Sequence, residues 1–472
     1  MNTGESSATA ASASDLPQKR DWRFILIAIV SGLGGLLFGY DTGVVAGVVL
    51  FLPNVFHFGA SMNGLFVAIA LAAAAFGAAF AGALSDAFGR RSVLMVTAVL
   101  FVAGAMLAAI AWSVPILFLG RAMVGAAIGV SSMITPLYLS EIAAAHWRGA
   151  IVTINQFYIT VGIFVSYIAD YLLSGFTDGW RWMLGLGIIP GVILLIGMTI
   201  LPESPRWLSG RGLVMRAEAA LRFLRNQLDV SVELGALRRD VVEGTRLAAP
   251  WSLLFEHKMR RPLIVGIGLA IFQQITGINA VLYFAPSIFQ AAGLSSTSVS
   301  ILATVGIGAV NVVMTAVAMR LLDSSGRRRL LLWGLWGMLV SLAIIGVGFM
   351  VQLHGALAYV IVTMVAVFVA FFAIGLGPIF WLLISEIFPL AIRGRAMSIA
   401  TVANWVSNMV ITGIFLNLLL AIGRGPTFLL YAGMTVLAIL FTLWIVPETK
   451  GRTLEEIENN LDVADQKPVS YP

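Results

Sequence analysis

The sequence predicts an all-α membrane protein with twelve transmembrane helices in two pseudo-symmetric six-helix bundles. Three observations predict this fold. Of the 472 residues, 59% are hydrophobic and 11% are charged, whereas a soluble domain usually contains about 25% charged residues. The apolar residues gather in runs long enough to cross a bilayer as helices. Motifs of the first half return in the same order in the second half.

The apolar runs fall into two groups of six on either side of a charged segment. They lie near 24–50, 62–85, 92–112, 115–142, 150–173 and 180–201, and near 262–290, 297–322, 329–351, 357–388, 394–420 and 426–446. The sequence therefore divides into a disordered N-terminal tail (1–22), a first bundle (23–201), a linker (202–261), a second bundle (262–446) and a C-terminal tail (447–472). The first apolar run has the length of a full span, not of a signal peptide.

The linker is charged and carries Leu and Phe at helical spacing, for example at Leu221, Leu224 and Leu228. This pattern is typical of short amphipathic helices lying under a membrane. Lys and Arg concentrate in the loops on the side of the linker and both tails, while the other side offers only Arg181 and Arg424. Because positive loops stay in the cytoplasm, we expect both termini to be cytoplasmic in a multi-pass protein of the cell (inner) membrane.

Three groups of residues repeat between the halves. Asp86, Gly89, Arg90 and Arg91 match Asp323, Gly326, Arg327 and Arg328; Glu141, Arg148 and Gly149 match Glu386, Arg393 and Gly394; the segment PESPRWL from Pro202 matches PETKGRTLEE from Pro447. The offsets of 237, 245 and 245 residues each cover six predicted helices, so the orientation is preserved. A parallel repeat of this kind predicts a site between the bundles, near the middle of the membrane.

The first span contains a glycine stripe and one acid. Gly35, Gly39, Gly43 and Gly47 recur every four residues, which lets a neighbouring helix approach closely. Asp41 is offset from Gly39 by roughly 200° and therefore points away from this stripe. A carboxylate in a spanning helix costs about 2.5–3.5 kcal/mol and normally faces an interior cavity. Asp41 is either a polar contact between helices or a functional acid, and we favour the second interpretation.

Several motifs together are specific to one family. They are GYDTG at Gly39, Gly-Arg-Arg at Gly89, PESPRWL at Pro202, QQITGIN at Gln273, PETKGRTLEE at Pro447 and the paired Glu…Arg-Gly loops. Over its whole length the chain resembles the sugar porter family of the major facilitator superfamily, and among its members the bacterial proton-coupled hexose and pentose symporters. The resemblance implies the major facilitator fold and import of a monosaccharide by proton symport through alternating access.

Amide side chains recur within the predicted spans. Gln and Asn donate and accept hydrogen bonds at once, which suits the hydroxyls of a neutral sugar. Gly277 lets the seventh span bend, and Trp381, after the helix-breaking GLGP at Gly375, can stack on a sugar ring. Any one amide alone could equally hold two helices together. The resemblance places sugar contacts at Gln156, Gln273, Gln274, Asn279, Asn311, Trp381 and Asn404, to which we add Tyr283 and Asn408.

Arg121 is the expected partner of Asp41. At 1.5 Å per residue, Arg121 lies roughly 9 Å and Asp41 roughly 12 Å below the same membrane boundary. The resemblance places the family's proton-coupling pair at these two positions. Protonation of Asp41 would release Arg121 and permit the bundles to rock. In related facilitators the acid is commonly Asn, so Asp41 favours symport, and a facilitative sugar or polyol uniporter is the alternative.

Eight charged residues near the expected cytoplasmic surface have two interpretations. The positive charges set the topology, and the resemblance also implies an inner-gate charge network that latches the two bundles together. These residues are Arg90, Arg91, Glu141, Arg148, Arg327, Arg328, Glu386 and Arg393. The usual basic residue after the loop Asp is replaced by Ala87 and Ser324. We therefore expect a weaker latch.

Other functions are less compatible with the sequence. The chain has no Cys, and its four His residues show no paired metal spacing, so neither a metal nor a cofactor is expected. No nucleophile–base constellation indicates an enzyme, and the basic residues sit in short loops rather than in a nucleic-acid-binding patch. A sugar sensor would tend to carry a longer C-terminal tail. The expected partners are a monosaccharide, a proton and the lipid bilayer, with the chain acting as a monomer.

Overall fold

The computed structural model describes residues 22–142, 148–227, 229–246, 254, 256–294, 296–351, 358–388 and 392–450. Every regular element in these ranges is a helix. The predicted N-terminal tail, except Trp22, and the predicted C-terminal tail from residue 451 onward lie outside the described residues.

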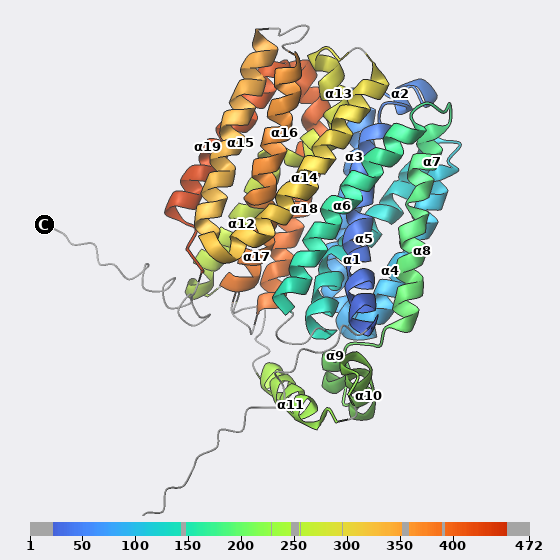
Figure 1. The fold of residues 1–472 in the computed structure, drawn as a ribbon, viewed down its shortest axis with the longest axis vertical. Helices are drawn as coiled ribbons and strands as arrows, with labels where there is room; N and C mark the ends of the chain where they lie inside the picture. The colour runs from blue at the N-terminus through green and yellow to red at the C-terminus, as the bar shows by residue number, and fades with distance from the viewer. Residues whose placement is uncertain are drawn as a thin grey trace, which may run out of the picture.

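Two groups of helices stand side by side in Figure 1, coloured blue to green and yellow to red. The first bundle contains α1 (Trp22–Val48), α2 (Leu52–Val55), α3 (Ala60–Phe88), α4 (Arg90–Ala109), α5 (Val114–Ile142), α6 (Arg148–Leu173), α7 (Gly179–Leu186) and α8 (Ile188–Ile200). The second contains α12 (His257–Ile275), α13 (Ile278–Ala292), α14 (Thr297–Ser325), α15 (Arg327–Met350), α16 (Ala358–Ile374), α17 (Leu376–Ile387), α18 (Arg393–Ala421) and α19 (Arg424–Trp444).

Within the described residues, eleven helical segments are long and apolar enough to cross a membrane, and a shorter apolar helix covers Gly32–Val48 of α1. Together they correspond to the twelve predicted spans. Three spans are interrupted by glycine: Gly187 separates α7 from α8, Gly277 separates α12 from α13, and Gly375 separates α16 from α17. Gly277 has a φ of 89°, which a residue with a side chain adopts only with strain. The last two breaks place polar backbone and side chains at mid-span.

The glycine stripe of α1 lies against α6, as the sequence predicts. A Cβ atom on Gly39 would collide with the carbonyl oxygen of Ile159, and one on Gly43 would collide with Ser166. Gly35 and Gly47 likewise approach Asn155 and Asp170 of α6. This close approach fixes the rotation of α1. It turns Asp41 toward α5 instead of α6.

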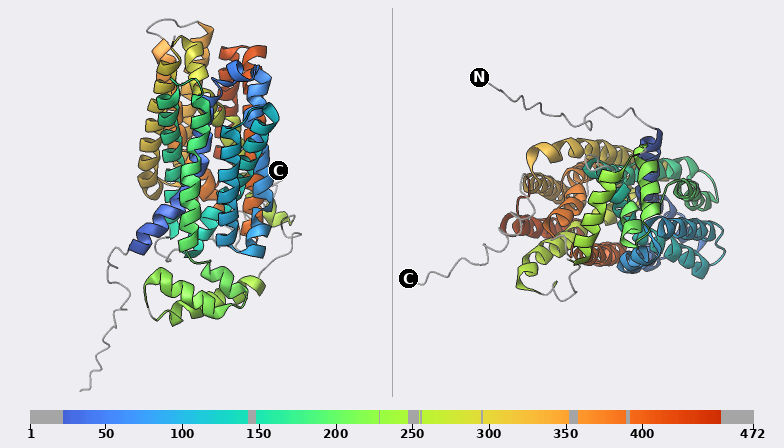
Figure 2. Two further views of the ribbon diagram at one scale, coloured as in Figure 1. Left: turned by 90° about the vertical axis from the view of Figure 1, so that its right-hand side faces the viewer. Right: turned by 90° about the horizontal axis from the view of Figure 1, so that it is seen from below.

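The linker forms α9 (Pro205–Gly210), α10 (Val214–Arg225) and α11 (Ser231–Arg246), which lie beneath the ends of the bundles in Figures 1 and 2. We call this end of the molecule the linker face and the opposite end the far face. Leu208 and Ala217 form a small buried cluster on which Trp207 and Leu234 pack. The last five residues of the predicted linker belong to α12, because that helix already begins at His257.

The two bundles contact one another mainly through α3 with α18 and α6 with α14. Near the far face, the hydroxyl of Ser61 donates to Asn417 at 2.9 Å. Tyr167 of α6 donates across the interface to the carbonyl oxygen of Leu282 at 2.9 Å. These contacts lie within the far-face halves of the membrane spans to which the residues belong. The structure is therefore closed between the bundles at the far face.

Candidate functional site

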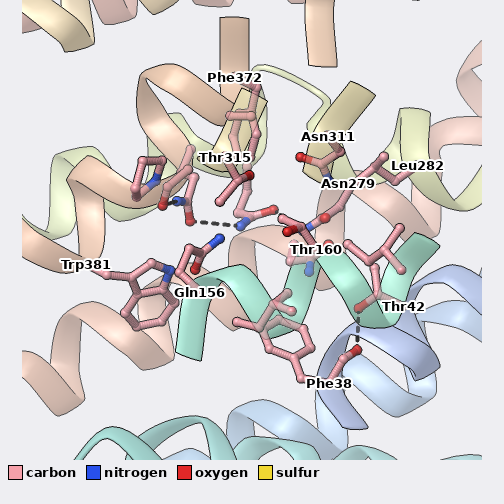
Figure 3. Close-up of a pocket in the computed structure, with 18 of the residues that line it drawn as sticks. Phe38, Thr42, Gln156, Thr160, Asn279, Leu282, Asn311, Thr315, Phe372 and Trp381 are labelled. Carbon is pink, nitrogen blue, oxygen red and sulfur yellow. Dashed lines mark hydrogen bonds between the residues drawn. The ribbon is translucent and has the colours of Figure 1, made fainter. Parts of the chain in front are cut away.

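A polar cavity lies between the bundles at mid-span (Figure 3). Elements of both halves contribute: α1 and α6 from the first bundle, and α12, α13, α14, α16, α17 and α18 from the second. None of the side chains that line it carries a formal charge. They are Phe38, Thr42, Gln156, Ile159, Thr160, Ile163, Gln273, Gln274, Asn279, Leu282, Asn311, Thr315, Phe372, Ala373, Gly377, Pro378, Trp381, Asn404, Trp405 and Asn408.

The second-bundle wall is a network of amides around the Gly277 break. Nδ2 of Asn404 donates to Oε1 of Gln273 at 2.7 Å, and Nε2 of Gln274 donates to Oδ1 of Asn404 at 3.2 Å. Nδ2 of Asn279 then donates to Oε1 of Gln274 at 2.8 Å. Nε2 of Gln273 donates to the carbonyl oxygen of Leu376 at 2.9 Å, next to the break at Gly375. The two helix breaks thus hold four amides in fixed orientations.

The first-bundle wall supplies an amide, hydroxyls and an aromatic ring. Gln156 and Thr160 come from α6, and Thr42 and Phe38 come from α1 (Figure 3). The two threonine hydroxyls donate back to carbonyl oxygens of their own helices, at 2.9 Å for Thr42 and 2.8 Å for Thr160. Their oxygen atoms keep the capacity to accept a hydrogen bond from a ligand.

Aromatic rings border the cavity on both sides. Phe38 of α1 and Trp405 of α18 meet across the bundle interface, with 5.1 Å between ring centroids. Trp381 packs edge-on against Phe380 at 4.8 Å and lies beside Gln156 in Figure 3. An aromatic face next to fixed amides suits a ring-shaped ligand that carries hydroxyls at its edge and C–H groups on its face.

The structure brings eight of the nine predicted sugar-contact residues to this one cavity. They are Gln156, Gln273, Gln274, Asn279, Asn311, Trp381, Asn404 and Asn408. Tyr283 is absent from the lining: it is 3% exposed and lies beside Thr42 and Asn408. The physical reason is the packing of α13 against α1, which covers the face of α13 that carries Tyr283.

Sequence reasoning missed the lining residues Phe38, Thr42, Thr160, Thr315, Phe372 and Trp405. Single Phe, Thr and Trp residues within apolar spans resemble packing residues, so composition does not identify them. A usable signal was present for two of them. Thr42 follows Asp41 directly, and Phe38 precedes Asp41 by one turn of α1. Both residues therefore lie next to the acid that the sequence analysis predicts to be functional.

Asp41 and Arg121 form a buried ion pair between α1 and α5. Nη1 and Nη2 of Arg121 both contact the carboxylate, the second at 3.2 Å from Oδ2. The residues are 9% and 2% exposed, respectively. The guanidinium carbon lies 5.2 Å from the ring centroid of Phe66 on α3, and Nε has no hydrogen-bond partner. Thr42, which follows Asp41 directly, lines the cavity. The ion pair therefore lies next to the cavity.

A charge cluster lies at the linker face of the first bundle. Arg90 contacts Glu141 of α5 with 3.0 Å between Nε and Oε2, and it also pairs with Asp86. Glu203, just after α8, accepts the backbone N–H groups of Arg90 and Arg91 at 2.9 and 3.1 Å. An acid at the start of a helix satisfies free N–H groups and complements the helix dipole.

The second bundle repeats this cluster. Arg327 contacts Glu386 at 3.1 Å, and Glu448 accepts the backbone N–H groups of Arg327 and Arg328 at 2.9 and 3.1 Å. The hydroxyl of Thr449 donates to Glu386 at 2.6 Å, as that of Ser204 does to Glu141 at 2.5 Å in the first half. The sequence repeat is thus reproduced contact by contact.

Each of these ion pairs joins elements of a single bundle, so the predicted latch between bundles is not formed by the described side chains in this state. The side chains of Arg148, Ser324 and Arg393 lie outside the described residues. At Ala87, the linker supplies a basic group that the sequence analysis did not anticipate. Nη2 of Arg211 donates to the carbonyl oxygens of Asp86 and Ala87, both at 2.8 Å.

Comparisons with known proteins agree on one family. The family model described as "Sugar (and other) transporter" matches residues 27–461. The galactose-proton symporter of Escherichia coli (strain K12) is 39% identical over 438 residues, covering 92% of this chain and 94% of that protein. The D-xylose transporter of Levilactobacillus brevis is 40% identical over 434 residues, covering 91% and 94%.

A solved structure gives the same result. The partially occluded inward open conformation of the xylose transporter XylE from E. coli matches with a TM-score of 0.81 and 33% sequence identity. The match covers 92% of this chain and 100% of that chain.

Proposed function

The chain belongs to the sugar transporter family, and from this premise we propose that it imports a hexose or pentose together with a proton by alternating access. It is a multi-pass membrane transport protein, not an enzyme. The observation that carries the proposal is the buried Asp41–Arg121 pair one residue away from an uncharged, amide-lined cavity. The carboxyl group of Asp41 can take up one proton, and the cavity can bind a neutral polyhydroxy ligand.

The cavity supports a sugar because its polar groups are neutral and bifunctional. Gln273, Gln274, Asn279 and Asn404 form hydrogen bonds with one another, so each of these amides has a partner within the protein. A sugar hydroxyl can replace one of these contacts while it donates to another amide oxygen. Ring stacking on Trp381 or Phe38 adds an apolar contribution that an ion or an unbranched chain would not gain.

The ion pair supports proton coupling. While Asp41 is ionised, the two contacts from Arg121 tie α1 to α5. A proton on the carboxyl group removes the negative charge and weakens this tie, since only a neutral hydrogen bond remains. Arg121 stays charged and turns to its remaining neighbours, among them the ring of Phe66. The neighbouring cavity residues Phe38 and Thr42 then move with α1, which links the proton to the sugar.

The structure is closed between the bundles at the far face, and a structure described as inward open is similar to it. We therefore assign the far face to the outside of the cell and the linker face, with both termini, to the cytoplasm, in agreement with the distribution of Lys and Arg. In this arrangement the chain works as a monomer in the cell membrane, because both bundles belong to one chain. The charge clusters at the linker face, which here join elements of a single bundle, are proposed to latch the two bundles together in the far-open state.

Accumulation of sugar against a gradient tests this proposal. Purified protein in liposomes is given an inward proton gradient and a panel of labelled hexoses, pentoses and polyols. Symport predicts accumulation above equilibrium, alkalinisation of the medium and abolition of both by a protonophore. A facilitative uniporter, the alternative function, would equilibrate the same sugar with no response to the gradient.

A further inference from the structure

Asp170 of α6 is a buried acid that the proposed coupling mechanism does not use. It is only 1% exposed although it lies three residues before the far-face end of its helix, a distance of roughly 5 Å. Its partner Gly47 occupies the last turn of α1. The carboxyl group is therefore enclosed where the two helices end, close to the water beyond the far face.

The partners of this carboxyl group are few. The backbone N–H of Gly47 donates to Oδ2 at 3.0 Å, whereas Oδ1 has no hydrogen-bond partner. No Lys or Arg forms an ion pair with Asp170 among the residues that the structure describes. A buried carboxylate without a cation is strongly unfavourable, and such a group takes up a proton instead.

Among the residues that the structure describes, the elements packed around Asp170 do not supply a compensating positive charge. The titratable groups near it on α1 and α6 are the phenols of Tyr40 and Tyr167, which carry no positive charge. On α7, which packs against both helices, Arg181 donates to the carbonyl oxygens of Ala109 and Ala111 at 3.0 and 2.8 Å and pairs with Asp178. Its guanidinium is thus held away from Asp170.

The same turn of α6 makes a contact that closes the far face. Tyr167, one turn before Asp170, donates to the carbonyl oxygen of Leu282 in the second bundle. Gly308 of α14 packs against the ring of Tyr167 and leaves no room for a side chain. When the bundles part at the far face, this contact is lost, and the turn of α6 that carries Tyr167 and Asp170 loses its cover from the second bundle. Hydration then allows Asp170 to ionise.

We propose that Asp170 is a second proton-binding site, occupied while the far face is closed, and that its ionisation favours the far-open state. The inference rests on the proposed function in one respect, namely that the two bundles alternate. Because the site lies at the far ends of α1 and α6, its proton enters and leaves through that face only. It therefore adds no proton to those carried with the sugar. It sets the pH at which the far face closes.

Distance measurements between spin labels test this proposal without any sugar. The chain has no native Cys, so Phe176→Cys and Val299→Cys provide the only labels, at sites 62% and 43% exposed beside the far ends of α6 and α14. Electron spin resonance distances are recorded in nanodiscs over a pH series, in an Asp41→Asn background that removes the titration of Asp41. We expect the longer, far-open distances to gain population as the pH rises.

Adding Asp170→Asn should hold the short, far-closed distance at every pH, because Asn accepts the same hydrogen bond from Gly47 and cannot ionise. Asp170→Glu should restore a pH response. His57→Gln, which alters an exposed titratable residue on the same face, should leave the response unchanged. If Asp170→Asn responds to pH like its parent, or if Asp170→Glu does not respond, the proposal is wrong. Failure of wild-type sugar uptake would refute the proposed function and not this inference.

Discussion

Arg121 of α5 donates hydrogen bonds from both terminal nitrogen atoms to the carboxylate of Asp41 of α1, and the arginine is 2% exposed. The contact ties two helices of the first bundle together next to the cavity. A buried pair of this kind is sensitive to its surroundings, because loss of one charge leaves the other without a partner. The behaviour of this pair on protonation is therefore central to the proposed function.

Phe66 is predicted to support Arg121 after Asp41 takes up a proton. An aromatic face stabilises a nearby cation by about 1–2 kcal/mol, and a cation freed from its carboxylate gains more from it than a paired one. Phe66→Leu should make release of Arg121 from Asp41 less favourable. Transport should then require a higher proton concentration. The pH of half-maximal uptake is expected to fall, by up to about one unit.

Phe118→Leu provides the matched control for this experiment. Phe118 packs against Phe66 with 6.5 Å between ring centroids, and the ring over the guanidinium is that of Phe66. Both variants remove an aromatic ring from the same cluster. A shift of the pH profile of equal size in both variants would contradict a specific role for Phe66.

Gln274 is predicted to be central to sugar affinity, since it connects Asn404 on one side with Asn279 on the other. Gln274→Ala leaves both of these amides without one partner and removes two possible contacts to the ligand. We expect the KM for sugar to rise roughly 10- to 100-fold. Tyr283→Phe, which alters a buried residue outside the cavity lining, should change KM much less. Equal effects of the two variants would contradict the site described here.

Gly39→Ala should disrupt the packing of α1 on α6. The added methyl group collides with the carbonyl oxygen of Ile159, which belongs to a helix backbone and cannot rotate away. Overpacking of this kind typically costs about 1–3 kcal/mol. A thermal unfolding assay of the detergent-solubilised protein should show a lower midpoint for Gly39→Ala. For Gly82→Ala, where the new methyl group meets open space, it should show little change.

Substitution of Glu203 and of Glu448 should have similar effects on stability, because the two acids occupy equivalent positions in the two bundles. Glu203→Ala removes the acceptor of two backbone N–H groups at the start of α4, and Glu448→Ala does the same at the start of α15. Loss of a helix cap costs about 1 kcal/mol, and more when several donors share it. Each variant should lower the unfolding midpoint to a similar extent. A large effect of only one of them would contradict the functional equivalence of the repeat.

Periodicity made much of the fold predictable. The length of the apolar runs determines the spans, and the four-residue spacing from Gly35 to Gly47 correctly places one face of α1 against a neighbour. The depth of Arg121 and Asp41 could also be counted from the span ends. These features depend on helix geometry alone, which is the same in every environment.

Other parts of the site depend on tertiary packing and could not be predicted in this way. Tyr283 follows Asn279 by one turn, yet the packing of α1 against α13 covers it while Asn279 lines the cavity. Phe66 faces Arg121 only because α3 packs against α5. Neither relationship leaves a pattern in the sequence, since a buried Phe or Tyr reads as an ordinary core residue. Asp170 is overlooked for a related reason: no motif contains it.

The most direct test of proton coupling compares wild type with Asp41→Asn in proteoliposomes that carry an inward proton gradient. Asn keeps the size of the side chain but cannot bind a proton. We predict that wild type accumulates sugar above equilibrium, while the variant only equilibrates or exchanges it. Exchange activity in the same preparation shows that the variant is folded. Gradient-driven accumulation by Asp41→Asn at the wild-type level would contradict the account.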